Sequence, residues 1–481
     1  MPSLIVKLCK STAFRYLFFR YLSYGLQFLN TIILLKYLGG YRYGLYSFSL
    51  LSINYLSYTN LGLNQSVNTI LSVKKDKTAL IIDVWSNAMT IVFTISCIIF
   101  LLNTIIQLFY PTFLGKYEYH NFGLFYVFIG LIANINLMYT ALYRIFNNYS
   151  KINFNQFFPP FITFALVLVF RSHLQLLPLF LAISIAYVFS LLFYIIQPPL
   201  HMKLRIKKPI ANIILRRGIN LMLYNFSYQY ISLAAITFVS VLFSPLCFGH
   251  FSLSVSISNA FVMLVASLLF MIYPKILNRL CSPNFSIIAN YLNKLKDTYV
   301  AFSDIIVIAG IISVAVSMQF FQQFSDICSS IIFLLIGQLF NNNSVGLCTT
   351  LIAHKKESSL TALGALSILF VILICFLFRF FNLPYYLYSI SVMLGLFMYS
   401  ELVLFYSRKL WPDFKSEFNG LYHNNIKYVI IILSSLLAIN SLRYPIIIAL
   451  IALLFFYVKP RYDGLKYYFL RIVRDNTFFN I

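Results

Sequence analysis

Two hydrophobic stretches near the N-terminus carry polar side chains at helical spacing. At 100° per residue, one face of the predicted helix 14–36 collects five of them: Arg20, Ser23, Tyr24, Gln27 and Thr31. The next predicted helix, 44–70, has a similar polar stripe: Ser57, Asn60, Asn64 and Asn68. Because the other faces are Leu, Ile and Phe, the two stripes are expected to face each other or water rather than lipid.

The residue types in these stripes suit a ligand that carries both phosphate and sugar. A guanidinium group pairs with phosphate oxygens, and amides, hydroxyls and tyrosine exchange hydrogen bonds with sugar hydroxyls. Two plainer alternatives stay open. The amides and hydroxyls can simply join helices by hydrogen bonds, and Arg20 can extend toward the lipid headgroups.

The composition places these helices in a membrane. Of the 481 residues, 60% are hydrophobic and only 10% are charged, whereas charged residues make up about 25% of a soluble chain. The net charge of +24 resides in short loops between apolar runs, so it does not indicate nucleic-acid binding. None of the seven cysteines forms a Cys-x-x-Cys pair, so neither a disulfide framework nor a metal site is expected, and no cofactor is expected.

The apolar runs predict an all-α polytopic protein with about 14 transmembrane helices, twelve plus two. Residues 1–200 and 201–410 should form two pseudo-symmetric six-helix lobes around a central cavity, and 411–481 should hold two extra spans and a basic cytoplasmic tail. The predicted spans are 14–36, 44–70, 80–109, 121–143, 156–170, 174–196, 219–243, 249–273, 299–322, 327–352, 359–379, 384–406, 427–440 and 444–458.

The distribution of basic residues orients this map. With the N-terminus inside, 29 Lys and Arg residues, Lys427 among them, fall in cytoplasmic segments and six fall outside. This bias predicts that both termini are cytoplasmic. The first span lacks a small-residue cleavage site and is expected to be retained as a signal anchor.

An internal repeat predicts where a ligand would bind. A shift of 205 residues places Gly44 on Gly249 and the polar stripe of the first span on that of the seventh. Such parallel repeats place a substrate site near the membrane midplane between two halves. The expected substrate-binding residues are Arg20, Tyr24, Gln27, Asn60, Asn64, Asn225, Gln229 and Asn259.

The acidic residues argue against a proton relay. Asp304 falls within about two turns of the cytoplasmic end of its predicted span, and none of the twelve acids falls at a predicted span centre. Glu401 lies seven residues before Arg408, nearly on the same helix face, which favours a structural ion pair. No nucleophile elbow, phosphate loop or His-Glu-x-x-His motif occurs in the sequence, so no enzymatic activity is expected.

A short segment resembles a known family. Leu38-Gly39, Tyr43-Gly44-Leu45-Tyr46 and Asn60-Leu61-Gly62-Leu63-Asn64 are similar to the second-helix signature of Wzx-type O-antigen and polysaccharide flippases. Those belong to the multidrug/oligosaccharidyl-lipid/polysaccharide (MOP) exporter superfamily. The match covers about 35 residues, and Asn60 and Asn64 replace the acid and the last glycine of the family pattern.

The resemblance implies a flippase of the bacterial inner membrane. Its substrates would be undecaprenyl-pyrophosphate-linked repeat units of O-antigen or capsule, moved from the cytoplasmic to the periplasmic leaflet by alternating access. The lipid-linked oligosaccharide would then be the partner, alongside membrane lipids, and the resemblance also allows a polymerase and other assembly proteins.

Three alternatives stay open. An O-antigen polymerase or ligase would carry a long periplasmic loop, whereas the longest outer segment here is about 110–120. A multidrug exporter of the same superfamily would prefer intramembrane acids that bind cations. A purely structural membrane protein gives no reason for Arg20 or for the matched stripes.

The topology can be tested by chemical labelling. In a chain without native cysteines, a cysteine introduced between residues 203 and 208 should resist a membrane-impermeant thiol reagent in intact cells, because this loop is predicted to be cytoplasmic. A cysteine at Lys116, in the longest outer segment, serves as the accessible control. Labelling within 203–208 would contradict the map.

Overall fold

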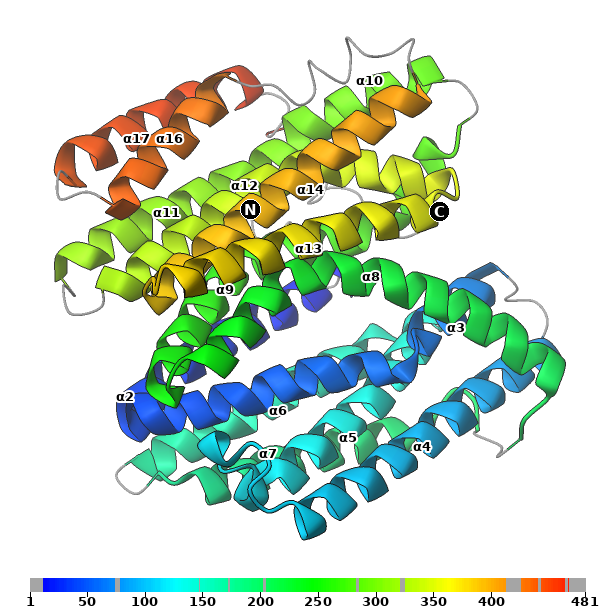
Figure 1. The fold of residues 1–481 in the computed structure, drawn as a ribbon. Coiled ribbons are helices and arrows are strands. Elements are labelled where there is room, and N and C mark those ends of the chain that lie inside the picture. The colour runs from blue at the N-terminus through cyan, green and yellow to red at the C-terminus, as the bar shows by residue number, and fades with distance from the viewer. Residues whose placement is uncertain are drawn as a thin grey trace, which may run out of the picture. The chain divides into compact units, whose positions relative to one another are not determined.

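The computed structural model describes residues 12–73, 78–146, 148–171, 174–201, 205–282, 285–320, 325–411, 425–439 and 443–462, together with Lys466. All regular structure in these ranges is helical (Figure 1), which confirms the expected all-α class. Ten of the described helices are long and apolar enough to cross a membrane. The chain is therefore a multi-pass membrane protein. The remaining predicted spans correspond to the helices Thr12–Leu56 and Leu63–Val73, to the helix Lys208–Leu242 and to the shorter helix Asn425–Ile439.

The chain divides into two compact units. The N-unit holds Thr12–Phe226 and Leu242–His250, and the C-unit holds Ser227–Val241 and the described residues from Phe251 onward. Two long helices, α8 (Lys208–Leu242) and α9 (Pro245–Leu280), contribute to both units. The predicted lobes 1–200 and 201–410, the appended segment 411–481 and the central cavity stay predictions.

The N-unit also contains six further α-helices: α2 (Thr12–Leu56), α3 (Leu63–Val73), α4 (Thr78–Phe109), α5 (Tyr119–Ile145), α6 (Tyr149–Val169) and α7 (Leu176–Ile195). Gly39 has non-helical angles, φ 76° and ψ 163°, and divides α2 into two helices. This is where the sequence predicted a turn between its first two spans. The second predicted span, 44–70, is not one helix, because a short 3₁₀ turn at Ser57–Asn60 interrupts it before α3 begins.

Helix α2 packs against α6 through side chains that bind backbone carbonyls. Pro160 has no N–H group to donate to the carbonyl of Gln156, and Ser23 Oγ donates to that oxygen at 2.8 Å. Asn30 Nδ2 donates to the Pro160 carbonyl at 3.0 Å. Ser23 and Asn30 are both buried. The serine of the predicted polar stripe therefore joins two helices, as the plainer alternative expected.

The C-unit is built around α12 (Ser325–Ala353), whose residues are mostly buried. Its other α-helices, besides its parts of α8 and α9, are α10 (Phe285–Leu295), α11 (Ala301–Phe320), α13 (Glu357–Phe380), α14 (Tyr388–Leu410), α16 (Asn425–Ile439) and α17 (Arg443–Val458). A π-helical turn at Lys296–Val300 joins α10 to α11. Helices α11, α14 and α16 all contact α12, and α17 contacts α11 and α16. The last two spans are thus part of the C-unit (Figure 1).

A buried ion pair connects these last spans to the rest of the unit. Lys427 Nζ of α16 donates to Asp304 Oδ1 and Oδ2 of α11 at 2.9 and 2.8 Å. Tyr457 of α17 donates to Asp304 Oδ2 at 2.7 Å, and Asn342 Nδ2 of α12 donates to Oδ1 at 2.9 Å. Lys427 also donates to Asn343 Oδ1 at 2.7 Å. Four helices therefore meet at one charged centre.

This centre corrects one expectation from the sequence. Asp304 is fully buried in the first turn of α11, and its distance from the end of a membrane span stays a prediction. Lys427 is only 4% exposed, so it is not a free charge in a cytoplasmic segment. The two charges neutralise each other, and each completes its hydrogen bonds with neutral polar neighbours.

Removal of one partner should destabilise the C-unit. Lys427→Met leaves the Asp304 carboxylate buried without a counter-charge, which costs about 3–5 kcal/mol. We expect a clearly lower midpoint of thermal unfolding in detergent, measured by fluorescence-detected size exclusion. The double variant Asp304→Leu with Lys427→Met should recover much of the loss, because it buries no charge. Equal instability of the single and double variants would contradict this account.

Candidate functional site

The interruption between α2 and α3 exposes backbone groups inside the N-unit. After the 3₁₀ turn, Leu61 and Gly62 adopt left-handed angles, with φ of 51° and 68°. Leu61 N donates to the Tyr58 carbonyl at 3.0 Å, and the helix resumes where Gln65 N and Ser66 N donate to the Gly62 carbonyl. In a membrane, such an interruption needs side chains or water to satisfy its freed backbone groups.

Two asparagines satisfy most of those groups. Asn60 Oδ1 accepts from Gly62 N at 2.9 Å. Asn134 of α5 donates from Nδ2 to the Leu56 carbonyl at 2.6 Å and to Thr59 Oγ1 at 3.0 Å. Asn60 and Asn134 are both buried. Asn60 Nδ2 also donates to Asn134 Oδ1, at 3.5 Å. Asn60 thus holds the interruption in place, and a contact between Asn60 and a ligand stays a prediction.

Beside the interruption, three amide side chains from two helices form a cluster. Asn225 Nδ2 of α8 donates to Gln65 Oε1 at 2.8 Å and to the Leu221 carbonyl at 3.0 Å. Asn64 Oδ1 accepts from Gln65 N at 2.8 Å. All three side chains are half-buried. Among the described residues, the Asn64 amino group and the Asn225 carbonyl oxygen have no protein partner, so both remain available to hydrogen-bond a ligand.

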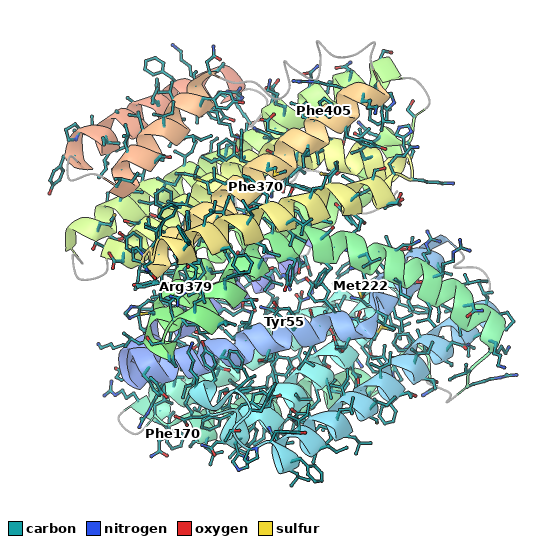
Figure 2. The ribbon with its side chains drawn as sticks, viewed as in Figure 1. Tyr55, Phe170, Met222, Phe370, Arg379 and Phe405 are labelled. Carbon is teal, nitrogen blue, oxygen red and sulfur yellow. The ribbon has the colours of Figure 1, made fainter. Side chains whose placement is uncertain are left out.

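Helix α8 passes very close to this interruption. A Cβ atom on Gly62 would overlap the Gly218 carbonyl of α8 and lie 3.0 Å from the Met222 Cβ. Met222 is labelled in Figure 2. Gly62 also needs a positive φ, which side-chain-bearing residues rarely adopt. The contact fixes α8, and with it Asn225, against the broken helix.

Arg20 lies on the first half of α2, about 12 Å from its start at Thr12 at a rise of 1.5 Å per residue. Its guanidinium carbon is 4.8 Å from the centre of the Tyr24 ring, and its Nε is buried without a hydrogen-bond partner. Arg20 and Arg144 of α5 both interact electrostatically with Tyr16. None of the ion pairs among the described residues involves Arg20. Its positive charge therefore lacks a carboxylate partner there.

The structure brings together some of the predicted site residues. Asn60, Asn64 and Asn225 meet at the helix interruption, and Arg20 stacks on Tyr24 on another part of the N-unit. Gln27 is exposed on the same helix as Arg20. Gln229 and Asn259 are exposed side chains of the C-unit. Their part in binding stays a prediction.

Sequence reasoning missed Asn134 and Gln65. Asn134 lies with Asn136 in the mostly apolar predicted span 121–143, and an amide at such a position can join helices by hydrogen bonds. Gln65 lies between two residues of the predicted stripe but points toward α8 because the helix is interrupted just before it.

The amide cluster offers hydrogen bonds, and Arg20 on another part of the N-unit offers a positive charge. Within the described part of the chain, no three His, Cys, Asp or Glu residues gather where they could hold a metal ion. In the N-unit, the described ion pair joins Lys207 to Asp83 and includes no residue of the amide cluster. The chemistry available is recognition of anions and of neutral polar groups.

Comparison with known proteins supports the fold but gives no sequence relative. No protein-family model matches the chain, and no curated protein gives a significant match. Among solved structures, the lipid II flippase MurJ in an inward closed conformation matches with a TM-score of 0.68 at 12% identity, over 93% of this chain and 98% of that one.

Transporters of the MOP superfamily also match. A multidrug resistance MATE family transporter in its inward-facing conformation aligns with a TM-score of 0.56 at 11% identity, over 84% of this chain and 96% of that one. A transporter from Pyrococcus furiosus, described as having a binding pocket of reverse polarity, aligns with a TM-score of 0.54 at 12% identity, over 86% and 96%. The chain therefore has the fold of MOP transporters.

A pair of glycine substitutions tests the helix interruption. Gly62→Ala should strongly lower the thermal stability and the membrane level, because the Cβ meets a backbone carbonyl and the φ of 68° disfavours alanine. Gly25→Ala is the matched control, since nothing lies within 4 Å of its added Cβ, and it should be neutral or slightly stabilising. Equal behaviour of the two variants would contradict the close crossing of Gly62 and Gly218.

Proposed function

We propose that this protein is a flippase for undecaprenyl-pyrophosphate-linked oligosaccharide repeat units, which it moves from the cytoplasmic to the periplasmic leaflet of the bacterial inner membrane. The observation that carries the proposal is Arg20, a guanidinium without a carboxylate partner among the described ion pairs, stacked on Tyr24 in a transporter fold. A phosphate group would supply the missing negative charge.

The chemistry of the proposed substrate fits the two parts of the N-unit. Arg20 would bind the pyrophosphate through its guanidinium group. The free amino group of Asn64 and the free carbonyl oxygen of Asn225 would donate to and accept from sugar hydroxyls. A ligand with both groups can use both parts, whereas a purely apolar ligand would use neither.

The broken helix suits the passage of a polar headgroup. Irregular backbone at membrane depth is tolerated where it is buried in protein or lines a water-filled space. Sugars and phosphates cannot cross hydrocarbon unaided, since each polar group left without a partner costs several kcal/mol. The polyprenyl tail can remain in lipid while the headgroup follows such a polar path. Alternating access with both termini cytoplasmic completes the proposal, and a polymerase and other assembly proteins would act on the product.

Multidrug export is the second candidate, because MATE transporters also share the fold. A lipophilic cation would need a carboxylate in the binding region. In the N-unit, which holds Arg20, the half-buried acid Asp83 is neutralised by Lys207. In the C-unit, Asp304 is neutralised by Lys427, and Glu401 is a half-buried acid without a described ion pair. The sign of the unpaired charge at Arg20 therefore favours an anionic substrate.

Substitution of Arg20 tests the proposal. Arg20→Ala should abolish surface polysaccharide while the protein stays in the membrane at its normal level, because the substrate loses its phosphate ligand. Arg20→Lys keeps the charge but loses the paired N–H geometry, so it should retain only part of the export. Both are measured by extraction and electrophoresis of surface polysaccharide in cells that depend on this chain.

Arg216→Ala provides the control, since Arg216 is an exposed arginine of α8 outside the proposed site. It should export normally. Intact polysaccharide in Arg20→Ala cells would contradict the role of Arg20. Loss of resistance to cationic drugs in the deletion strain, with normal polysaccharide, would instead favour multidrug export.

A further inference from the structure

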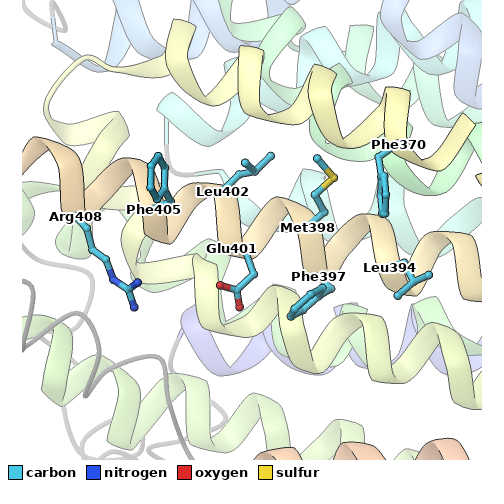
Figure 3. A pocket seen from close by; sticks show the side chains of 8 residues that line it. All are labelled: Phe370, Leu394, Phe397, Met398, Glu401, Leu402, Phe405 and Arg408. Atoms are coloured by element: carbon cyan, nitrogen blue, oxygen red, sulfur yellow. The ribbon is translucent and has the colours of Figure 1, made fainter. Parts of the chain in front are cut away.

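The charged side chains of the C-unit differ in whether they meet a partner. Figure 3 shows Glu401 and Arg408 lining a groove beside α14 together with apolar and aromatic residues. The structural ion pair expected between these two is wrong, because the ion pairs among the described residues do not include them. Asp304 and Lys427, by contrast, are both buried and in direct contact. The contacts around this second pair indicate which kind of ion they suit.

Three oxygen atoms surround the Lys427 ammonium. Asp304 contributes both carboxylate oxygens, at 2.9 and 2.8 Å from Nζ, and Asn343 contributes Oδ1 at 2.7 Å. These oxygens come from α11 and α12, whereas the ammonium reaches them from α16. Carboxylate and amide oxygens are also the ligands that hard metal cations prefer in proteins. The ammonium therefore occupies a place that has the composition of a cation site.

A second set of contacts orients the carboxylate of this site. Tyr457 donates to Asp304 Oδ2 at 2.7 Å, and Asn342 Nδ2 donates to Oδ1 at 2.9 Å. Hydrogen bonds of this kind fix the ligands of bound metal ions. A π-helical turn, Lys296–Val300, also directly precedes α11, and such turns are frequent at functional sites. Neutral neighbours thus hold the oxygen ligands in place independently of the lysine.

Charge and distance decide which cation these ligands suit. One buried carboxylate balances one positive charge, so a divalent ion would leave a buried charge in excess. Arg461 and Lys296 also act electrostatically on Lys427, which further disfavours a second positive charge. The ammonium keeps its oxygens at 2.7–2.9 Å, whereas Mg²⁺ requires about 2.0–2.1 Å and Ca²⁺ about 2.3–2.6 Å. The site therefore suits a large monovalent cation.

We propose that this centre is a binding site for a monovalent cation of the size of ammonium or potassium, and that the protein fills it with its own lysine. The Lys427 side chain acts as a tethered cation that holds α16 against α11 and α12. The C-unit therefore keeps its cation permanently, and an ion from solution enters only when the lysine side chain is shortened. The site does not depend on which substrate the protein transports.

A shortened side chain at position 427 tests this directly. The full chain with Lys427→Ala is purified in detergent and transferred to chloride salts of choline, sodium, potassium or ammonium at equal ionic strength. Potassium and ammonium should each raise the midpoint of thermal unfolding by about 3 °C or more relative to choline, because a ligand that binds only the folded state stabilises it. The shift should saturate with concentration. The wild type should unfold at the same midpoint in all four salts.

Lys427→Met is the matched control, because methionine lacks the charge but still fills the space of the lysine stem. Its midpoint should not respond to the choice of cation. The double variant Asp304→Leu with Lys427→Ala should not respond either, since it lacks the carboxylate. Extraction of Lys427→Ala with potassium present throughout allows a chain that needs the ion to be recovered folded.

Four results would overturn the proposal. They are a midpoint of Lys427→Ala that is the same in choline and potassium, an equal response of Lys427→Met, a larger response to sodium than to potassium, and failure to recover folded Lys427→Ala even in potassium. The first and last would show that Asp304 and Asn343 bind the lysine only. The second would show a general effect of the salts, and the third would contradict the match in size between the site and ammonium.

Discussion

The need to satisfy backbone polar groups where helices are interrupted shapes most of the N-unit. Water is scarce inside a membrane protein, so each freed N–H or carbonyl needs a side-chain partner. Asn60 and Asn134 provide such partners at the broken second span, and Ser23 and Asn30 provide them beside the proline pair of α6. Lys151 does the same at the end of α7, where its ammonium donates to the carbonyls of Phe193, Ile196 and Gln197. These polar side chains thus lie where a helix is interrupted, contains proline or ends.

Charged residues that form ion pairs within the protein have structural roles, whereas charged residues without such a pair are candidates for functional roles. Asp83 with Lys207 and Asp304 with Lys427 are paired within the protein. Arg20, Glu401 and Arg408 lack such pairs among the described residues, and each lies beside aromatic side chains. An unpaired charge in a membrane protein is costly to maintain. Each of these three charges therefore needs water or a group from outside the described residues to balance it.

The sequence predicted the all-α class and the approximate spans, because long apolar runs have one physical explanation in a chain of this composition. It also found Asn60, Asn64 and Asn225, which the structure brings together. It could not show that the second span is broken, since Gly62 and its neighbours read equally well as an unbroken helix. The contact between Gly62 and Gly218 depends on residues 156 positions apart, which no local pattern reveals.

The charged residues show the same limit. The sequence placed Lys427 at the cytoplasmic end of the predicted span 427–440 and Asp304 in the predicted span 299–322, without any sign that the two are partners. Only the packing of α11, α12, α16 and α17 shows that the two charges are partners. Likewise, helical phase suggested an ion pair between Glu401 and Arg408, but phase alone does not fix the reach of two flexible side chains.

The ion pair between α11 and α16 also bears on how the protein is made. Asp304 and Lys427 are 123 residues apart, so at about 5–20 residues per second the ribosome completes the lysine about 6–25 s after the aspartate. During that interval α11 must enter the bilayer with an acid that has no counter-charge, either protonated or shielded by the insertion machinery. A nascent chain that stops before α16 keeps the acid without its counter-charge. The charge balance of the C-unit is therefore completed only late in synthesis, when α16 packs against α11 and α12.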